Sequence, residues 1–277
     1  MDIFRGEYDL LHHLNKRGLK PLLFFVSIFM ILLEETTMNV KELQQWINAK
    51  IIKENLPLTL LKDDGVGGPL TRSTFIMLFV NKNATAITEA QKLEMARSLG
   101  DTTTKRINAV AQVESAGFGW FDNGLPKILY ERHYFYKFVM KSINWLSFGQ
   151  LAAPSSGGYT VDMSKNGIND NWDKLAAAVC INPDGALQSV SIGSFQVMGK
   201  WYKDCGYAHP IDMLWDARNG EYGHYKMLVG FIKANKLTKQ FLSISTIAAA
   251  NVPFVRAYNG PAWKKNDYAN KLAQAMR

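Results

Sequence analysis

Cysteine is scarce in this chain, whose 277 residues include only Cys180 and Cys205. Two cysteines cannot form the disulfide framework of a small secreted domain, and their separation does not match the spacing of a zinc site. A single bridge between them stays open if the protein works outside the cytosol. Otherwise we expect both to be small core residues, because neither has the neighbouring His motif of a cysteine nucleophile.

The histidines also lack a ligand pattern. His133, His209 and His224 show no H-E-x-x-H or comparable spacing, which disfavours a zinc-dependent amidase. The glycines at positions 65, 67 and 68 do not fit the phosphate-binding pattern G-x-x-x-x-G-K-[ST], and no strand is predicted before them. We therefore expect neither a metal nor an organic cofactor.

Charged residues make up only 20% of the chain, whereas apolar residues make up 47% and aromatic residues 12%. This balance excludes a disordered chain or a coiled coil, and the length suits one large domain or two modest ones. The sequence has no uncharged apolar run of the roughly 18 residues that a membrane span needs. The net charge of +8 favours an anionic partner, but the basic residues are too sparse for a nucleic-acid-binding arm.

Residues 1–37 differ in character from the rest. A short apolar run over residues 21–33 follows three basic residues between positions 16 and 20. That is the order of a signal peptide, although no small-residue cleavage site follows it. The segment is therefore a signal or membrane-arrest segment, a buried helix of the folded domain, or a leader outside the functional product, with Met38 as the true start. Any membrane contact or export would depend on this segment.

The next segment, residues 38–95, reads as a small helical bundle. Val40, Leu43, Trp46 and Ile47 share one face of a predicted helix. A second helix is predicted from Thr71 to Val80, after a Gly-rich turn, with Thr71 as its N-cap.

The turn in this segment carries a motif. It consists of an Asp-Gly turn, a Gly-Pro pair and a Thr that opens a helix, matched by Asp64, Gly65, Gly68, Pro69 and Thr71. Residues 38–95 thereby resemble the small peptidoglycan-binding module of cell-wall hydrolases. The longer stretch over residues 50–57 departs from that pattern and leaves the ligand groove open. The alternative is a purely structural helical cap, since glycines also serve turn geometry alone.

Glu114 stands out in the helix that is predicted to follow the N-cap cluster at residues 101–104. It shares an apolar face with Ile107, Val110 and Ala111. Gly117 and Gly119 are expected to end this helix and place Glu114 in its last turn. Partial burial and the negative end of the helix dipole both disfavour the ionised carboxylate. A carboxyl that stays protonated near neutral pH is suited to general acid catalysis, whereas an exposed Glu at a stripe's edge would only reach water.

Four ordered motifs accompany this helix. They are Val113-Glu114-Ser115 with Gly117 and Phe118, then Pro126 to His133, then Ser191 to Gly199 with Gln196 inside it, and finally Tyr258-Asn259-Gly260-Pro261. Over residues 99–277 they resemble the lysozyme-like superfamily, and most closely the N-acetylmuramidase family found in phage endolysins. The resemblance implies a mainly α fold, with helices and a small β-hairpin region, preceded by the three-helix binding domain.

The resemblance also implies roles for these residues. Glu114 would protonate the glycosidic oxygen between N-acetylmuramic acid and N-acetylglucosamine. Gln196 and Tyr258 would line the cleft beside the scissile bond, Asn259 would support it or bind an acetamido group, and Ser115 would contact substrate. Against these roles, Gln196 and Tyr258 could also be buried groups bonded only within the protein.

The second carboxylate is less defined. Glycosidases with two carboxylates place them about 5 Å apart for retention and roughly 6.5–9.5 Å apart for inversion. Glu131 is the candidate for a base or nucleophile, with Asp122 a weaker one. We favour a structural role for Glu131, paired with Arg132 or His133, because some lysozyme-like relatives work with one essential acid.

The resulting prediction is a monomeric peptidoglycan hydrolase of phage or prophage origin, made in the bacterial cytoplasm and acting on glycan strands in the periplasm. A lytic transglycosylase would use the same acid, and a non-catalytic wall-binding protein would leave Glu114 structural. The sequence does not separate the first two. Trp120, Trp201, Trp215 and Trp263 supply surfaces for sugar stacking, although at least two of them are expected in the interior.

Overall fold

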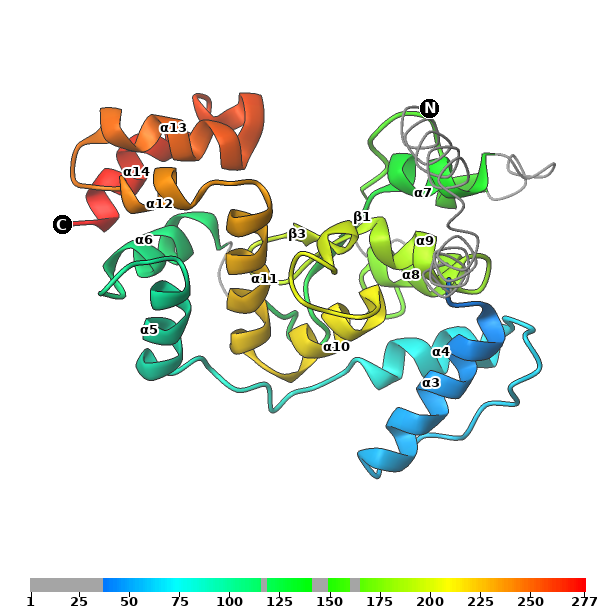
Figure 1. Cartoon of the computed structure of the whole chain (residues 1–277). Coiled ribbons are helices and arrows are strands. Elements are labelled where there is room, and N and C mark those ends of the chain that lie inside the picture. Colours follow the sequence, from blue (N-terminus) through cyan, green and yellow to red (C-terminus); the bar gives the residue numbers. More distant parts are fainter. Residues whose placement is uncertain (1–36, 116–118, 141–148, 160–164) are drawn as a thin grey trace, which may run out of the picture. The chain divides into compact units, whose positions relative to one another are not determined.

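The computed structural model describes residues 37–115, 119–140, 149–159 and 165–277, with the side chains of residues 261 and 262 left out (Figure 1). The chain divides into two compact units, Met1–Thr37 and Met38–Arg277. The predictions for residues 1–36 fall outside the described residues, and only the second unit is treated below. Among the described residues, no helix combines the length and the apolar character needed to cross a lipid bilayer.

The second unit is mainly helical and contains one small antiparallel sheet. Its elements, in chain order, are α3 (Val40–Lys53), α4 (Pro69–Leu78), α5 (Glu89–Ser98), α6 (Lys105–Glu114), β1 (Ile128–Tyr130), α7 (Arg132–Val139), α8 (Asp170–Val179), α9 (Pro183–Gln188), β2 (Val190–Ile192), β3 (Val197–Met198), η2 (Gly199–Trp201), α10 (Pro210–Asn219), α11 (Glu221–Ala234), α12 (Thr238–Leu242), α13 (Ala248–Asn259), η3 (Gly260–Trp263) and α14 (Tyr268–Ala275).

Helices α3 and α4 form where the apolar spacing predicts them, but their caps differ from the prediction. Asn39 and Glu42 form a capping box at the start of α3. Helix α4 begins with Gly68 as N-cap and Pro69 in its first turn, since proline fits the first helical position. The prediction that Thr71 caps this helix is therefore wrong. Thr71 lies inside α4, where its buried hydroxyl accepts a hydrogen bond from Gln44 Nε2 at 3.4 Å.

These first helices pack into the rest of the unit through aromatic side chains. The Phe79 ring lies 5.5 Å from that of Trp172 in α8, and the Trp46 ring lies 5.6 Å from that of Trp215 in α10. Trp46 Nε1 also donates to Asp212 Oδ1 at 3.3 Å. The predicted boundary near residue 95 thus does not separate two compact units, because the larger unit runs from Met38 to Arg277.

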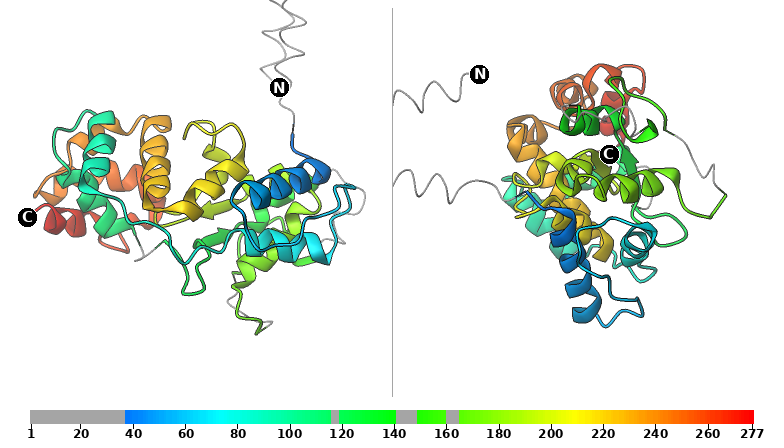
Figure 2. Two further views of the ribbon diagram at one scale, coloured as in Figure 1. Left: turned by 90° about the horizontal axis from the view of Figure 1, so that it is seen from below. Right: turned by 90° about the vertical axis from the view of Figure 1, so that its right-hand side faces the viewer.

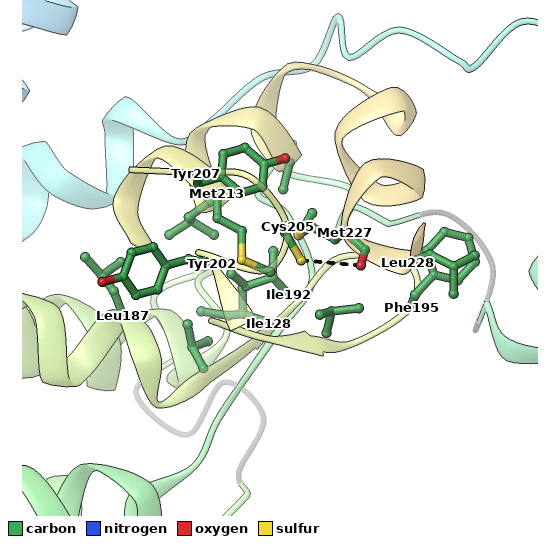
Figure 3. Close-up of a cluster of buried hydrophobic side chains, with 14 of the residues drawn as sticks. Ile128, Leu187, Ile192, Phe195, Tyr202, Cys205, Tyr207, Met213, Met227 and Leu228 are labelled. Atoms are coloured by element: carbon green, nitrogen blue, oxygen red, sulfur yellow. Dashed lines mark hydrogen bonds between the residues drawn. The ribbon is translucent and has the colours of Figure 1, made fainter. Parts of the chain in front are cut away.

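The sheet has the order β1-β2-β3 with both pairs antiparallel. Ile128 faces Ile192 across the first pair, and Ile192 faces Val197 across the second. All three are buried, and Figure 3 shows Ile128 and Ile192 in the core with Phe195 and Leu228. The predicted β-hairpin region is therefore present, with its turn at residues 193–196.

Both cysteines are free, so the bridge that the sequence left open does not form. Cys205 lies in the core of Figure 3, where its Sγ donates to the Met227 carbonyl oxygen at 3.5 Å. Burial raises the pKa of the Cys205 thiol to about 12 and raises that of Cys180 above its usual value. Neither thiol is activated as a nucleophile. Cys205 is a core residue as predicted, whereas Cys180 is only half-buried and lies outside the core.

The C-terminal helices pack together with α6. Helix α14 packs against both α13 and α6, and α11 contacts α5, α12 and β3. Figures 1 and 2 show α11 standing between this group and the sheet. The ends of α6 and α13 are thereby brought together, although residues 114 and 259 are far apart in the sequence.

Candidate active site

Glu114 is the last residue of α6, and Ser115 follows it as C-cap with an extended backbone. The fully buried Ile107 and Val110 hold the apolar face of this helix against the core. The position in the final turn is thus confirmed, but α6 ends before the glycines that were expected to end it. Of these, Gly117 lies outside the described residues. Ser115 donates its backbone N–H to the Ala111 carbonyl oxygen.

The start of α6 is held through Asp101, a member of the predicted capping cluster, which accepts the Thr103 backbone N–H at 3.2 Å. Thr104 is the N-cap but makes no side-chain capping bond. Instead Arg106 Nη1 contacts both carboxylate oxygens of the buried Asp101 at 3.1 Å. One guanidinium nitrogen is thus shared between the two oxygens, and a charge-assisted hydrogen bond of this kind is stronger than a neutral one. The first turn of the helix that carries Glu114 is therefore rigidly placed.

The carboxyl group of Glu114 is mostly buried and has one hydrogen-bond partner within the described residues. Asn259 Nδ2 donates to its Oε1 at 2.9 Å. Burial raises the pKa of Glu114 to about 7, while the Asn259 hydrogen bond and the charge of Lys271 oppose the rise. Because the amide donates to Oε1, the proton of the neutral acid belongs on Oε2. The site thus holds a carboxylic acid that is still partly protonated at neutral pH.

Tyr258 lies one residue before this amide, in the last turn of α13. Its ring stacks on Phe254 at 5.5 Å and meets Phe231 edge-on at 5.2 Å. Its hydroxyl is buried and has no hydrogen-bond partner among the described residues. Burial, followed by the charge of Glu114, raises the pKa of this phenol far above its ordinary value. Tyr258 therefore keeps a neutral, buried O–H.

Gln196 lies in the turn between β2 and β3 and adopts a positive φ of 49°. Ser191 Oγ donates to its Oε1 at 2.9 Å, and its Nε2 donates to the Gly193 carbonyl oxygen at 2.8 Å. The side chain is exposed but bonded at both ends of its amide. The turn thus presents Gln196 in one fixed orientation.

His224 fixes this turn through hydrogen bonds, a role that the sequence did not predict. Its Nδ1 accepts the Ser194 backbone N–H at 3.1 Å and lies 2.9 Å from the Ser194 hydroxyl, while its Nε2 lies 2.9 Å from the Ala217 carbonyl oxygen. Burial lowers the pKa of His224 to about 4. The neutral ring also stacks on Trp120 at 4.4 Å. Gly119 and Gly193 lie against the ring, where a Cβ atom at either position would collide with it. In the sequence, these two glycines were the only indirect sign that a side chain packs so closely here.

Glu131 follows β1 and is the N-cap residue of α7. Its Oε2 accepts the Tyr159 hydroxyl at 2.6 Å and lies 3.2 Å from His133 Nδ1. Burial and the contact with Glu131 raise the pKa of Tyr159 to about 12. One of the two carboxylate oxygens of Glu131 thus contacts both Tyr159 and His133. This arrangement favours the structural role over that of a free base.

The candidate residues thus fall into two groups. Glu114, Tyr258 and Asn259 meet at the ends of α6 and α13. Glu131 and Gln196 lie next to the strands of the sheet. Glu131 follows β1 and donates its backbone N–H to the Ser189 carbonyl oxygen, and Gln196 lies in the turn between β2 and β3. Within the described part of the chain, no hydrogen bond or ion pair joins Glu114 to Glu131 or to Gln196. Asp122 lies in the loop before β1 and lines a separate cavity of about 360 Å³ with Lys82 and Trp120.

The Gly-rich turn of the N-terminal segment is closed onto α3. Asp64 Oδ1 accepts the Val66 N–H at 2.9 Å, and Gly65 donates its N–H to Gln44 Oε1 at 2.9 Å. Gly65 has a φ of +79°, which favours glycine. Together with Gly68 and Pro69 at the start of α4, the motif residues build a turn and a helix start. These contacts give the motif a structural role in this segment.

Of the four tryptophans considered for sugar stacking, only Trp215 is buried, whereas Trp120, Trp201 and Trp263 are half-buried. The expectation of at least two interior rings is thus wrong. Trp263 lines a cavity of about 520 Å³ beside Arg256. Among the residues that the structure describes, no group of three or more His, Cys, Asp or Glu side chains is arranged to hold a metal ion.

Comparisons with known proteins decide the family. The model of the N-acetylmuramidase family matches residues 103–277. This range includes Glu114, Glu131, Gln196, Tyr258 and Asn259, but not the Gly-rich motif at residues 64–71. The chain belongs to the N-acetylmuramidase family. It is thus a glycoside hydrolase that acts on peptidoglycan. The matched range begins inside the span of residues 99–277 that the motifs predicted.

The fold of this muramidase also matches a solved structure. The crystal structure of Burkholderia AP3 phage endolysin aligns over 86% of this chain and 93% of that chain, with a TM-score of 0.60 and 24% sequence identity. The predicted mainly helical, lysozyme-like fold is thereby confirmed. No curated protein sequence matches the chain.

Proposed function

We propose that the protein is an endolysin that hydrolyses the glycosidic bond between N-acetylmuramic acid and N-acetylglucosamine, with Glu114 as general acid. The observation that carries the proposal is the state of this carboxyl group. It is buried enough to raise its pKa to about 7, and Asn259 fixes its Oε1. The group can therefore give up a proton at neutral pH while its orientation is maintained.

The reaction begins with proton transfer from Glu114 Oε2 to the glycosidic oxygen as the bond to the anomeric carbon breaks. Positive charge develops on the sugar ring in an oxocarbenium-like transition state. As Glu114 becomes a carboxylate, the hydrogen bond from Asn259 strengthens. Water then attacks the anomeric carbon and gives up a proton, which returns the Glu114 carboxylate to its acid form directly or through solvent. A reducing N-acetylmuramic acid end is left.

The neutral polar groups of the site orient the substrate and this water. Tyr258 has a buried hydroxyl with no hydrogen-bond partner among the described residues, which would need a small opening of the site to reach substrate. Gln196 presents a fixed amide on the exposed turn of the sheet. Glu131 contacts Tyr159 and His133, and these three residues would form one side of the cleft. One catalytic carboxyl thus carries the proton transfer, and the second carboxylate supports the cleft. Ser115, directly after Glu114, would contact a sugar substituent.

The remaining parts extend this proposal. Residues 38–95 would bind peptidoglycan with the exposed surface around Asp64 and Gly65. Glycan strands would be the only macromolecular partner of a monomeric enzyme. The protein would be made in the bacterial cytoplasm and act on the wall after its release. The anionic stem peptides of the wall suit a chain with a net charge of +8.

Mass spectrometry of fragments released from purified peptidoglycan tests the proposal. The chain should release fragments with reducing N-acetylmuramic acid ends, and Glu114→Gln should release none while still binding the walls. Glu131→Gln is the matched carboxylate variant and should retain most of the activity. Anhydro ends would instead identify a lytic transglycosylase with the same acid. Equal turnover by the Glu114→Gln protein would overturn the assignment, and no release by any form would indicate a binding protein.

A further inference from the structure

A cavity of about 520 Å³ opens beside the last turn of α13, lined by Arg256, Gly260, Trp263 and Lys264. Arg256 and Lys264 are exposed. Neither cation lies within ion-pair distance of an acidic side chain among the described residues. Lys264 Nζ instead lies 5.6 Å from the centre of the Trp263 ring. The cavity therefore offers two cations that have no acidic partner in the described part of the chain, next to an aromatic surface.

The cavity adjoins the candidate catalytic acid through α13. Arg256 and Asn259 are three residues apart in this helix, so their side chains lie on neighbouring parts of one face. Asn259 holds the carboxyl group of Glu114, and Gly260 follows directly with a φ of +59° and open space where a Cβ would be. A substrate that reaches Glu114 can thus extend over Gly260 into the cavity.

The side-chain chemistry of this cavity selects an anion on an organic ligand. A guanidinium binds a carboxylate through parallel hydrogen bonds, and an ammonium adds a compact charge. An indole ring offers apolar contact to the adjoining peptide or sugar. A neutral glycan alone would leave both cations without a partner. The carboxylates of peptidoglycan belong to its stem peptides, which branch from the sugar next to the scissile bond.

We propose that Arg256, Lys264 and Trp263 form a subsite for a stem-peptide carboxylate. The proposal rests on the proposed function, because the substrate must be the peptide-bearing glycan. In this arrangement, the subsite gives the enzyme a preference for walls whose peptides carry free carboxylates. It also places the peptide-bearing sugar in register with Glu114.

The test compares native walls with walls whose carboxylates have been converted to amides by carbodiimide and ammonia. The Arg256→Gln/Lys264→Gln double variant should lose about tenfold in kcat/KM on native walls, as expected for two charge-assisted contacts at an exposed site. On amidated walls it should match the unmodified enzyme. Lys265→Gln removes an exposed neighbouring cation that does not line the cavity, and should behave like the unmodified enzyme on both substrates.

Two results would overturn the subsite. One is an equal loss by the double variant on native and amidated walls, which would assign it a role other than carboxylate recognition. The other is an effect of Lys265→Gln as large as that of the double variant, which would reduce the finding to general charge attraction. In both cases reducing ends would still be released and would still depend on Glu114. Failure of the proposed function would look different, because no form would release them.

Discussion

At the scale of single residues, burial shifts the pKa values of Glu114 and His224 in opposite directions. The pKa of Glu114 rises from an ordinary 4.5 to about 7, and that of His224 falls from 6.5 to about 4. Both shifts keep the group neutral, since burial penalises the charged form. The neutral state has a separate use at each position: a proton to donate at Glu114, and a hydrogen-bond acceptor for the turn at His224.

These two groups should act oppositely on stability as the pH changes. From pH 4.5 to 7, folded Glu114 retains a proton that the unfolded chain has lost, so the free energy of unfolding falls as pH rises. From pH 4 to 6.5, the unfolded chain binds a proton that buried His224 does not, so the free energy of unfolding rises with pH. Each contribution amounts to about 3 kcal/mol over its full window. Across the shared range the two nearly cancel.

Matched variants should expose each contribution. Glu114→Gln should make the chain gain stability steeply from pH 4.5 to 6.5, because only the His224 contribution is left. His224→Asn should be less stable throughout, because the ring and its contacts are lost, and should lose further stability as pH rises over that range. Urea unfolding at three pH values measures both slopes. Two variants with the same pH dependence as the unmodified chain would contradict the account.

At the scale of elements, the sequence predicts local structure well and packing poorly. The 3.6-residue spacing of Ile107, Val110 and Glu114 predicts α6 and the place of its acid, because both depend on neighbouring residues. The contact between Glu114 and Asn259 is non-local and was not predicted. The resemblance to a family implied only that both residues belong to one cleft. His224 was missed because a single histidine carries no periodic signal, and its partners lie on β2–β3 and α10.

The predicted N-terminal module shows the same limit. The apolar faces of helices α3 and α4 predict that both helices form. They do not predict which residues of the rest of the chain pack against those faces. In the structure Phe79 packs on Trp172 and Trp46 on Trp215. Deleting residues 38–95 would uncover these rings, so the deletion would not separate wall binding from folding.

Phe79→Ala tests this integration directly. The fully buried ring should cost about 3–5 kcal/mol of stability when it is truncated to alanine. Because residues 38–277 form one compact unit, a single unfolding transition of the whole unit should move to lower temperature. Met77→Ala, at an exposed position in the same helix, is the control and should have little effect. Calorimetry would contradict the expectation if a separate, smaller transition moved while the main one stayed in place.

At the scale of the whole molecule, Met38, the first residue of the larger unit, forms a hydrogen bond with the carboxylate of Asp184. The Met38 backbone N–H donates to Asp184 Oδ2 at 3.0 Å, and Asp184 Oδ1 is buried with no partner among the described residues. Burial raises the pKa of Asp184, while the bond from Met38 opposes the rise. An α-ammonium group at Met38 would bring two further donors and a positive charge to this position.

A chain that starts at Met38 should therefore be stabilised by Asp184 more than the full chain is. We expect Asp184→Asn to cost at least about 1 kcal/mol more in residues 38–277 than in residues 1–277, because hydrogen bonds between charged partners exceed neutral ones by about that amount. Urea unfolding of the four proteins measures the difference as a double-mutant cycle. Acetylation of the α-amine in the shorter chain removes its charge and should abolish the extra cost. An equal cost of Asp184→Asn in both chains would show that the carboxylate recognises the Met38 amide alone. Residues 1–37 would then make no energetic difference at this contact.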